Sequence, residues 1–165
     1  MDTFLKWAGG KRWLLKRTDE LLPDMSKSRR YLEPFLGGGS MFFHLEPKTA
    51  FLSDINEDLI NTYKTIASKP KELISILQQL QNEFHFLENK PEEKKEYYYQ
   101  KRDLYNTRKE EQSEQAALFI FLNRTCFNGL YRVNSKNMYN VPMGGYKKPT
   151  ICDKENILAV NNVLQ

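Results

Sequence analysis

The stretch Tyr31-Leu-Glu-Pro-Phe-Leu-Gly-Gly-Gly-Ser40 decides the fold, because a short apolar run here ends in three consecutive glycines. Residues 41–45 behind it have the pattern of a helix start, and residues 50–54 form a second apolar run that ends in Asp54. A strand, a glycine turn, a helix and a second strand ending in an acid are typical of a nucleotide-binding βαβ unit. We therefore predict an α/β fold.

The glycines and the acid of this unit fit a nucleoside cofactor. Gly37 and Gly39 would let a ligand approach the backbone closely, and Asp54 offers the acceptor lone pairs that suit the two adjacent hydroxyls of a ribose. The third glycine of the dinucleotide fingerprint is missing, because Phe42 stands at that position. A glycine-rich turn that holds no ligand would have the same residues, so both interpretations remain open at this point.

A second glycine turn lies near the start of the chain, in Phe4-Leu-Lys-Trp-Ala-Gly-Gly-Lys11. It resembles the end of a phosphate loop, but Arg12 stands where magnesium needs Ser or Thr, which argues against a nucleoside triphosphatase. What remains is a turn that presents Trp7 as an apolar plate and Lys11 as a cation that could meet a carboxylate. A core tryptophan beside a solvated lysine is the alternative. A short amphipathic helix is expected next, ending at Pro23.

The bulk properties indicate one domain, or one domain with a small insertion, since the chain has 165 residues and 40% of them are hydrophobic. The formal net charge of +4 permits a polyanionic partner without proving one. Cys126 and Cys152 match no metal-ligand spacing, so we expect reduced thiols and no metal site. The start of the chain lacks the architecture of a signal peptide, and the longest apolar run, residues 116–122, is too short to span a bilayer. We expect a soluble cytoplasmic protein.

The middle of the chain is predicted to be helical. Residues 56–67 have a capping residue and an acidic first turn, and the leucine stripe of residues 70–87 indicates packing. The mixed charges of residues 92–111 favour a solvated helix face with aromatic residues turned inward; a nucleic-acid surface is the alternative. Ser113 is expected to cap a further helix that runs through Leu122.

Residues 123–149 alternate apolar and polar positions around a central polar turn at 135–137, which predicts a β-hairpin. Arginine can bind guanine with two hydrogen bonds and asparagine can bind adenine, while lysines position phosphates and an aromatic residue can enter a base stack. A basic hairpin without such a function would look similar. The residues that would serve this purpose are Arg124, Phe127, Arg132, Lys136, Lys147 and Lys148.

Taken together, these segments resemble the Dam-type DNA adenine-N6 methyltransferases, in the group whose target-recognition insert precedes the catalytic motif. The resemblance covers nearly the whole chain and rests on four motifs in the family's order: Phe4–Lys11, Glu33–Ser40, Leu52–Asn56, and the hairpin region in its two pieces Phe127–Arg132 and Asn140–Pro149. It implies a Rossmann-like S-adenosylmethionine methyltransferase fold with a helical and β-hairpin insert. Residues 1–68 would be the cofactor-binding part, 69–150 the recognition insert, and 151–165 the return to the catalytic domain.

The resemblance also implies roles for single residues. Lys11 would lie near the methionine end of S-adenosyl-L-methionine and Asp54 would hold its ribose hydroxyls. The full set of implied cofactor residues is Trp7, Lys11, Phe35, Gly37, Gly39 and Asp54. Double-stranded DNA would be the partner, with a GATC-like site whose adenine is flipped out of the stack. Arg132 would read a guanine, and the implied DNA-binding residues are Phe127, Asn128, Leu130, Arg132, Pro142, Tyr146 and Lys147.

One departure from the family concerns catalysis. The family transfers its methyl group at an Asp-Pro-Pro-Tyr tetrapeptide, whereas this chain has seven prolines and no two are adjacent. In the family's order the tetrapeptide follows the insert, so we expect a truncated, N-terminal part of the fold, with residues 31–36 forming an open strand edge and no catalytic residue assigned. The alternatives are an inactive DNA- and cofactor-binding remnant, one half of an enzyme completed by a second, C-terminal chain, and an α/β domain that binds another nucleotide.

Overall fold

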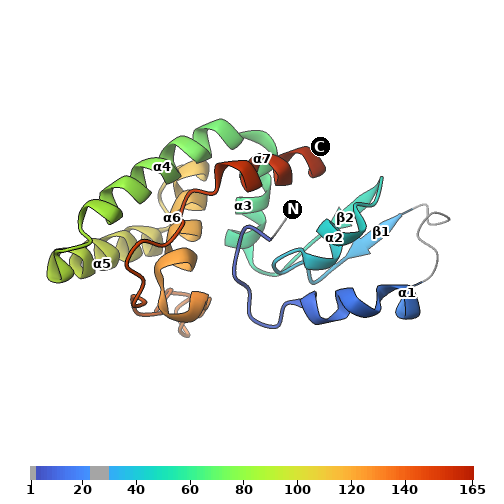
Figure 1. Cartoon of the computed structure of the whole chain (residues 1–165), viewed down its shortest axis with the longest axis horizontal. Helices are drawn as coiled ribbons and strands as arrows, with labels where there is room; N and C mark the ends of the chain where they lie inside the picture. Colours follow the sequence, from blue (N-terminus) through green and yellow to red (C-terminus); the bar gives the residue numbers. More distant parts are fainter. Residues whose placement is uncertain (1–2, 23–29) are drawn as a thin grey trace.

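The computed structural model describes residues 3–22 and 30–165. Helices dominate it: the longer ones gather toward one end of an elongated molecule, and the other end carries a small sheet together with the first, shorter helices (Figure 1). Within the described residues, the helices are η1 (Lys11–Arg17, a 3-10 helix), α1 (Thr18–Leu21), α2 (Ser40–Leu45), α3 (Glu57–Ser68), α4 (Pro70–Phe86), α5 (Pro91–Thr107), α6 (Gln112–Thr125), η3 (Phe127–Gly129, 3-10) and α7 (Lys154–Val163). The strands are β1 (Tyr31–Glu33) and β2 (Ala50–Leu52).

The predicted βαβ unit is present. β1 and β2 pair in parallel, with Leu32 opposite Phe51, and α2 connects them. β1 is shorter than the predicted strand of residues 31–36 because Pro34 has no N–H to donate. Pairing nevertheless resumes where the Leu36 N–H donates to the Ser53 carbonyl at 3.0 Å. In the described part of the chain the sheet has two strands only. The Leu32 and Phe51 side chains on one of its faces are exposed to solvent.

The predicted helices of the middle segment are confirmed. The Asn56 side chain accepts a hydrogen bond from the Leu59 N–H at 3.0 Å and so caps α3. α4 and α5 each begin with proline, Pro70 and Pro91, whose fixed backbone suits the first helical position. The first helical segment differs from the prediction, because it is a 3-10 helix followed by a single α-turn. Its predicted end at Pro23 lies outside the described residues.

α6 forms the centre of the core. It is buried on nearly all sides and packs on α3, α4 and α5, so one core runs through both predicted parts of the chain. The expectation that Ser113 caps this helix is wrong. The residue before the helix is Glu111, and Ser113 lies buried in the first turn, where its hydroxyl has no hydrogen-bond partner among the described atoms.

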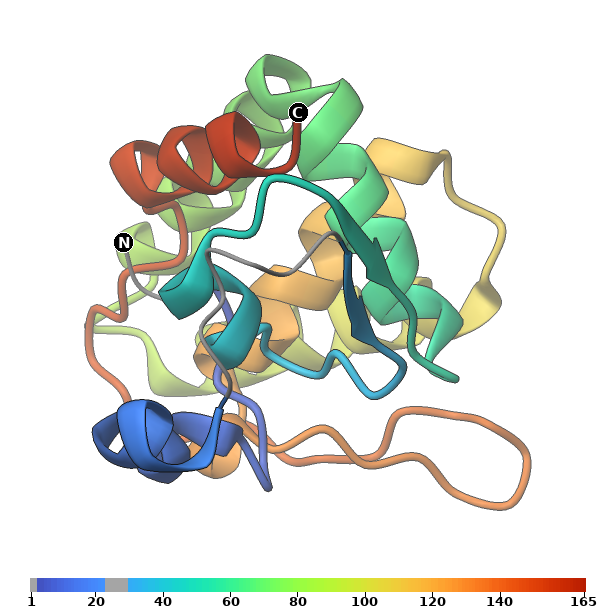
Figure 2. The same cartoon turned by 90° about the vertical axis from the view of Figure 1, so that its right-hand side faces the viewer.

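The predicted hairpin is present as a connection but not as paired strands. Val133 and Tyr139 form one antiparallel bridge, and the Asn134 side chain accepts hydrogen bonds from the N–H groups of Lys136 and Met138 to close the turn. Between this bridge and a second one, Cys126–Met143, the arms are not paired as strands, because the 3-10 turn η3 interrupts the first arm. We call residues 127–145 the recognition hairpin, after the role that the resemblance implies for them; the hairpin projects from the body of the molecule as the orange loop of Figure 2.

Both cysteines are free and buried, Cys126 at the base of the recognition hairpin and Cys152 just before α7. Burial raises the pKa of both thiols. Among the described residues, no helix combines the length and the apolarity that crossing a membrane requires. The same residues contain no group of three or more His, Cys, Asp or Glu side chains placed to hold a metal ion.

Candidate functional site

A cavity of about 200 Å³ opens where the two strands end. Its walls come from the first glycine turn, from the glycine loop after β1 and from the end of β2. The structure brings all six sequence-predicted cofactor residues to this cavity, although they are spread over 48 positions of the chain. They are Trp7, Lys11, Phe35, Gly37, Gly39 and Asp54.

Asp54 joins two of these walls. Its Oδ2 accepts a hydrogen bond from the Gly37 N–H at 2.9 Å, and its Oδ1 accepts one from the Asn56 N–H at 3.0 Å. A carboxylate has about four lone-pair sites, so each oxygen keeps acceptor capacity for a ligand. The carboxylate is thus held in place and still able to bind a pair of hydroxyls.

The glycine loop has no space for side chains. Gly37 and Gly39 have φ angles of +52° and +70°, which other residues rarely adopt. A Cβ on Gly37 would lie 2.9 Å from Cδ1 of Trp7, and one on Gly39 would lie 2.6 Å from the Tyr63 hydroxyl oxygen. The Tyr63 hydroxyl also donates to the Gly37 carbonyl at 3.1 Å. Burial raises the pKa of Tyr63, with Glu33 and Asp54 adding to the shift, so it remains a donor.

Lys11 forms an ion pair with the carboxylate of Glu33. Its Nζ lies 2.8 Å from Oε1 of Glu33 and 2.5 Å from the Phe35 carbonyl oxygen. Oε2 of Glu33 accepts a hydrogen bond from the Tyr31 hydroxyl at 2.8 Å. The predicted cation is therefore present at the cavity, but it is already paired with the buried Glu33, which the sequence analysis did not single out as a site residue.

The predicted aromatic plate is covered on one face. Trp7 stacks on Tyr131 with ring centroids 5.4 Å apart and an interplanar angle of 24°. Phe35 lies at the rim and is 76% exposed. The cavity is therefore lined by the exposed ring of Phe35 and by the ring of Trp7, which stacks on Tyr131.

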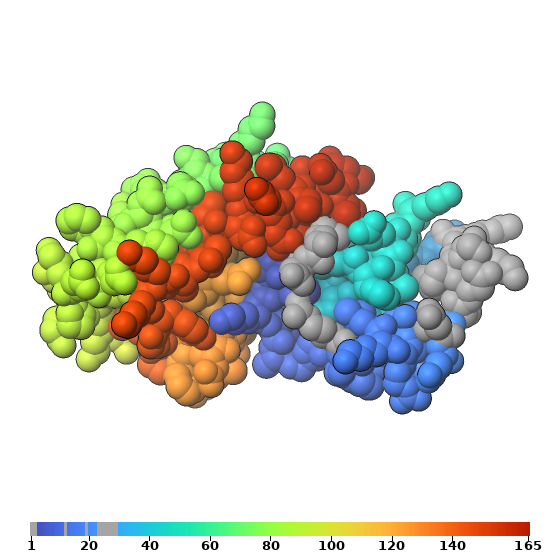
Figure 3. Space-filling model, viewed as in Figure 1, coloured from blue at the N-terminus to red at the C-terminus, as the bar shows by residue number. Residues whose placement is uncertain are grey.

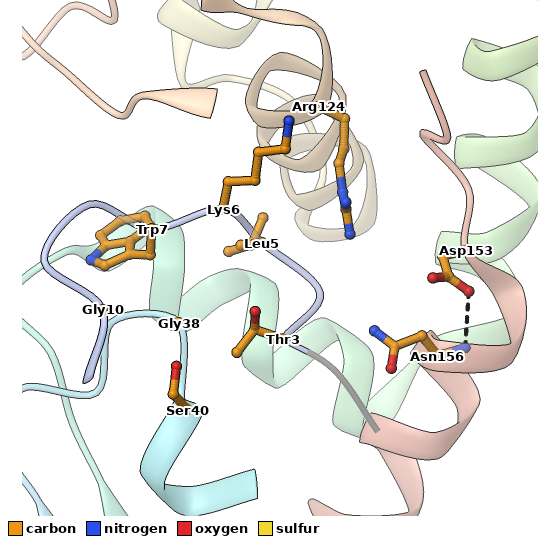
Figure 4. Close-up of a pocket in the computed structure, with 10 residues that line it drawn as sticks. All are labelled: Thr3, Leu5, Lys6, Trp7, Gly10, Gly38, Ser40, Arg124, Asp153 and Asn156. Carbon is orange, nitrogen blue, oxygen red and sulfur yellow. Dashed lines mark hydrogen bonds between the residues drawn. The ribbon is translucent and has the colours of Figure 1, made fainter. Parts of the chain in front are cut away.

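A second cavity of about 520 Å³ adjoins the first, and the two share Trp7, Gly10, Gly38 and Ser40. In Figure 4 the Arg124 side chain enters it from the α6 side, while Asp153 and Asn156 face it from α7. One guanidinium nitrogen of Arg124 donates to the Phe4 carbonyl at 2.8 Å. Burial lowers the pKa of Arg124 and Asp153 opposes that shift.

The predicted DNA-binding residues lie on the recognition hairpin and the segment after it. Phe127, Asn128, Arg132, Pro142 and Lys147 are exposed, whereas Leu130 and Tyr146 are half-buried. The Phe127 N–H donates to the Pro142 carbonyl at 2.9 Å, which places these two residues together. The Arg132 guanidinium donates to the Asn140 side chain at 2.7 Å. Five of the seven are therefore available on the surface.

Lys94 holds the segment that carries Tyr146 and Lys147. Its side chain is almost fully buried, and its Nζ donates to the carbonyl oxygens of Tyr146 at 3.1 Å and Lys147 at 2.6 Å. Burial lowers the pKa of Lys94. The Tyr146 hydroxyl in turn accepts a hydrogen bond from Lys6 Nζ at 3.2 Å.

Sequence reasoning missed Lys6, Glu33, Lys94 and Tyr131. Glu33 gave a detectable signal, because it is an acid inside a short apolar strand. Lys6 and Lys94 are two among 25 basic residues, and only their long-range contacts distinguish them. Tyr131 fitted the alternation of a hairpin and so gave no separate signal.

Comparison with known proteins identifies a matching family model and several relatives of this chain. Residues 7–165 match the family model of the D12 class N6 adenine-specific DNA methyltransferases. The type II methyltransferase M.MjaIII of Methanocaldococcus jannaschii is 46% identical, covering 98% of this chain and 58% of that protein. The type II methyltransferase M1.LlaDCHI of Lactococcus lactis subsp. cremoris is 42% identical, over 98% and 54%. DNA adenine methylase of Escherichia coli K12 is 38% identical, over 92% and 51%.

The chain thus spans about half the length of the curated relatives that it matches. The family match extends from the first glycine turn through the glycine loop and Asp54 to the recognition hairpin and α7. On this ground the chain belongs to the family of D12 class N6 adenine-specific DNA methyltransferases.

Proposed function

We propose that this chain supplies the cofactor-binding half-site and the target-recognition surface of a DNA methyltransferase. The enzyme would move a methyl group from S-adenosyl-L-methionine to N6 of adenine in a short duplex site, GATC-like by resemblance. The observation that carries the proposal is the convergence of the six predicted cofactor residues on one cavity next to the recognition hairpin.

The residues around the cavity fit the chemistry of this cofactor. Asp54 keeps acceptor capacity for the ribose hydroxyls, and the glycine loop leaves its backbone open to close approach. Exposed Phe35 offers an aromatic surface beside them. The cofactor supplies an activated methyl group when it is bound. Its charged methionine end would meet Lys11 and Glu33, which together offer both signs of charge.

The recognition hairpin fits a duplex. Exposed Arg132 can bind a guanine edge in the major groove, and Lys147 can bind a phosphate. Phe127 is 51% exposed at the base of the hairpin, where an apolar ring could enter the base stack beside an extruded adenine. We assign Asn128, Leu130, Pro142 and Tyr146 to the same surface. The supporting observation is that all seven residues belong to one continuous segment and its immediate extension.

The proposal divides the chain into a cofactor part at residues 1–68, a recognition insert at 69–150, and a return segment at 151–165. It assigns positioning and binding to these residues. No described side chain is assigned to accept the N6 protons, because the Asp-Pro-Pro-Tyr tetrapeptide that does so in this family is absent from the sequence.

The proposal is tested with the protein produced from its complete coding sequence. We expect transfer of a tritiated methyl group to a duplex that contains GATC, and none to a duplex whose GATC adenines already carry the N6 methyl group. Sinefungin, an unreactive analogue of the cofactor, should bind to the wild-type protein in a calorimeter. An absence of sinefungin binding would overturn the cofactor assignment.

Asp54→Ala should weaken the binding of sinefungin by about 1.5–3 kcal/mol, because a hydrogen bond to a charged acceptor contributes that much. The matched control is Asp103→Ala, which removes a 76% exposed carboxylate from α5, away from the cavity. It should leave the affinity unchanged. If Asp54→Ala behaves like this control, Asp54 does not hold the cofactor.

A further inference from the structure

The N-terminal segment, residues 3–11, lies between the two parts of the proposed site. In Figure 3 it is the dark blue surface between the orange residues that end α6 and the blue and cyan residues of the sheet end. One side of this segment lines the cavity of the glycine loop, and the other side contacts the recognition hairpin. A ligand in the cavity can therefore influence the hairpin through direct contacts.

One of these connections passes through two aromatic rings. The Trp7 indole packs against Gly37 of the glycine loop, so closely that a Cβ there would lie 2.9 Å from the ring. Trp7 also stacks on Tyr131, at a centroid distance of 5.4 Å. The glycine loop and the recognition hairpin are thus linked by one stacked pair.

Tyr131 is tightly surrounded. Its ring lies 5.5 Å from that of Phe119 and 5.8 Å from that of Tyr139, and its hydroxyl lies 3.5 Å from Oδ2 of Asp58. The next residue along the chain is Arg132, the predicted guanine reader. Because the Tyr131 ring is held by these neighbours, its position fixes where the Arg132 backbone leaves the body of the protein.

A second connection runs in parallel through Asn123 at the end of α6. Its side-chain oxygen accepts from the Lys6 N–H at 2.9 Å, and its side-chain nitrogen donates to the carbonyls of Lys6 at 2.8 Å and Gly129 at 3.1 Å. The Asn123 side chain therefore links the N-terminal segment to the base of the hairpin by hydrogen bonds.

We propose that Tyr131 is a positioning residue that couples the cofactor cavity to the recognition hairpin through its stack on Trp7, so that each ligand raises the affinity for the other. The inference rests on the proposed function. Cofactor bound against the glycine loop restricts Trp7, Trp7 restricts Tyr131, and Arg132 is then already ordered when DNA arrives. Linkage requires the effect to be reciprocal.

A thermodynamic cycle tests this coupling on the protein from its complete coding sequence. The affinity for a duplex that contains GATC is measured with and without saturating sinefungin. We expect sinefungin to raise the DNA affinity of the wild type about five-fold or more, within the usual range of coupling between two sites. Tyr131→Leu should bring this ratio close to one, and Tyr131→Phe, which keeps the stacked ring, should retain it.

A purely structural loss would lower both affinities and leave their ratio unchanged, so an unaltered ratio in Tyr131→Leu overturns the inference. A ratio of one in the wild type does the same. If either sinefungin or the duplex fails to bind the wild type, the proposed function is wrong, and so is this inference, which rests on it.

If Tyr131→Leu does not fold, hydrogen exchange on the wild-type protein tests the coupling instead. Sinefungin alone, without DNA, should slow exchange at the backbone amides of residues 130–133. Unchanged exchange at these amides, under conditions where sinefungin is bound, overturns the coupling.

Discussion

Among single residues, those of the glycine loop leave the least freedom for substitution. Gly39 adopts a left-handed conformation at the start of α2, and its Cα faces both Tyr63 and Phe43. Two separate constraints therefore act on one position: the backbone favours glycine, and the surrounding side chains leave no room for a methyl group.

Gly39→Ala should lower the free energy of unfolding by about 2–5 kcal/mol. The left-handed conformation costs a side chain about 1–2 kcal/mol, and forcing a methyl group into a packed site costs about 1–3 kcal/mol more. Gly145→Ala is the matched control, because a Cβ there would meet nothing within 4 Å. Urea unfolding curves measure both; equal midpoints would show that the loop can move aside.

The positions of the candidate site residues were predictable from the sequence where they depend on a local pattern, and their roles stay predictions. Asp54, Gly37 and Gly39 follow strand ends, so their place beside a common cavity could be inferred from the βαβ pattern. The partner of Lys11 could not, because Glu33 is 22 positions away and is revealed only when β1 is placed against the first glycine turn.

Secondary-structure elements were predicted well where one segment determines its own structure. The cap at Asn56, the leucine stripe of residues 70–87 and the mixed charges of residues 92–111 each predict a helix, and those helices are present. The hairpin was predicted with too much strand, because the 3-10 turn η3 (Phe127–Gly129) interrupts the first arm between the bridges Cys126–Met143 and Val133–Tyr139. Alternation of apolar and polar residues does not reveal such a turn.

Asn123 connects three elements: the end of α6, the N-terminal segment and the base of the recognition hairpin. Asn123→Ala should lower the free energy of unfolding by about 1–3 kcal/mol or more, because a buried polar group left without a partner costs about 1–3 kcal/mol and the substitution removes the partner of three backbone groups. Asn82→Ala, on the exposed face of α4, is the control and should stay within about 0.5 kcal/mol of wild type. Similar destabilisation by both would mean that the three hydrogen bonds contribute little.

In the molecule as a whole, tyrosine is a major component of the core. Tyr63, Tyr98, Tyr105 and Tyr139 are each at most 5% exposed. Burial raises the pKa of all four, and nearby carboxylates add to the shift for Tyr63 and Tyr105. In the unfolded chain the same side chains lose their protons near pH 10.

The protein should therefore unfold cooperatively in alkali. Above pH 10 the native state binds more protons than the unfolded state, so stability falls as pH rises. Each of the four tyrosines contributes about 1.4 kcal/mol per pH unit, which would remove a typical stability of about 5–15 kcal/mol within roughly one to three units. Tyrosinate absorbance and circular dichroism should change together; buried tyrosines that ionise while the helical signal persists would contradict this.

At this scale the sequence supported the α/β class and the family, and the structure adds how the parts meet. The prediction divided one domain into a cofactor-binding part at residues 1–68 and a recognition insert at 69–150, without saying how the two parts pack. In the structure α6 packs on α3 and α4 alike, and residues 3–11 lie between the glycine loop and the hairpin. Such an arrangement depends on contacts more than 100 positions apart, for example Lys6 with Asn123, which no local pattern encodes.

The two buried cysteines can report local opening of the fold. The Cys126 thiol is fully enclosed and donates to the Leu130 carbonyl at 3.3 Å, beneath the recognition hairpin. Cys152 is covered where α7 meets α4. Since thiolate is the reactive form and burial disfavours it, alkylating reagents reach either sulfur only during transient opening. The rate of alkylation at Cys126 then measures how often the base of the hairpin opens, and the rate at Cys152 measures how often the α4–α7 contact opens. Neither measurement needs an introduced probe.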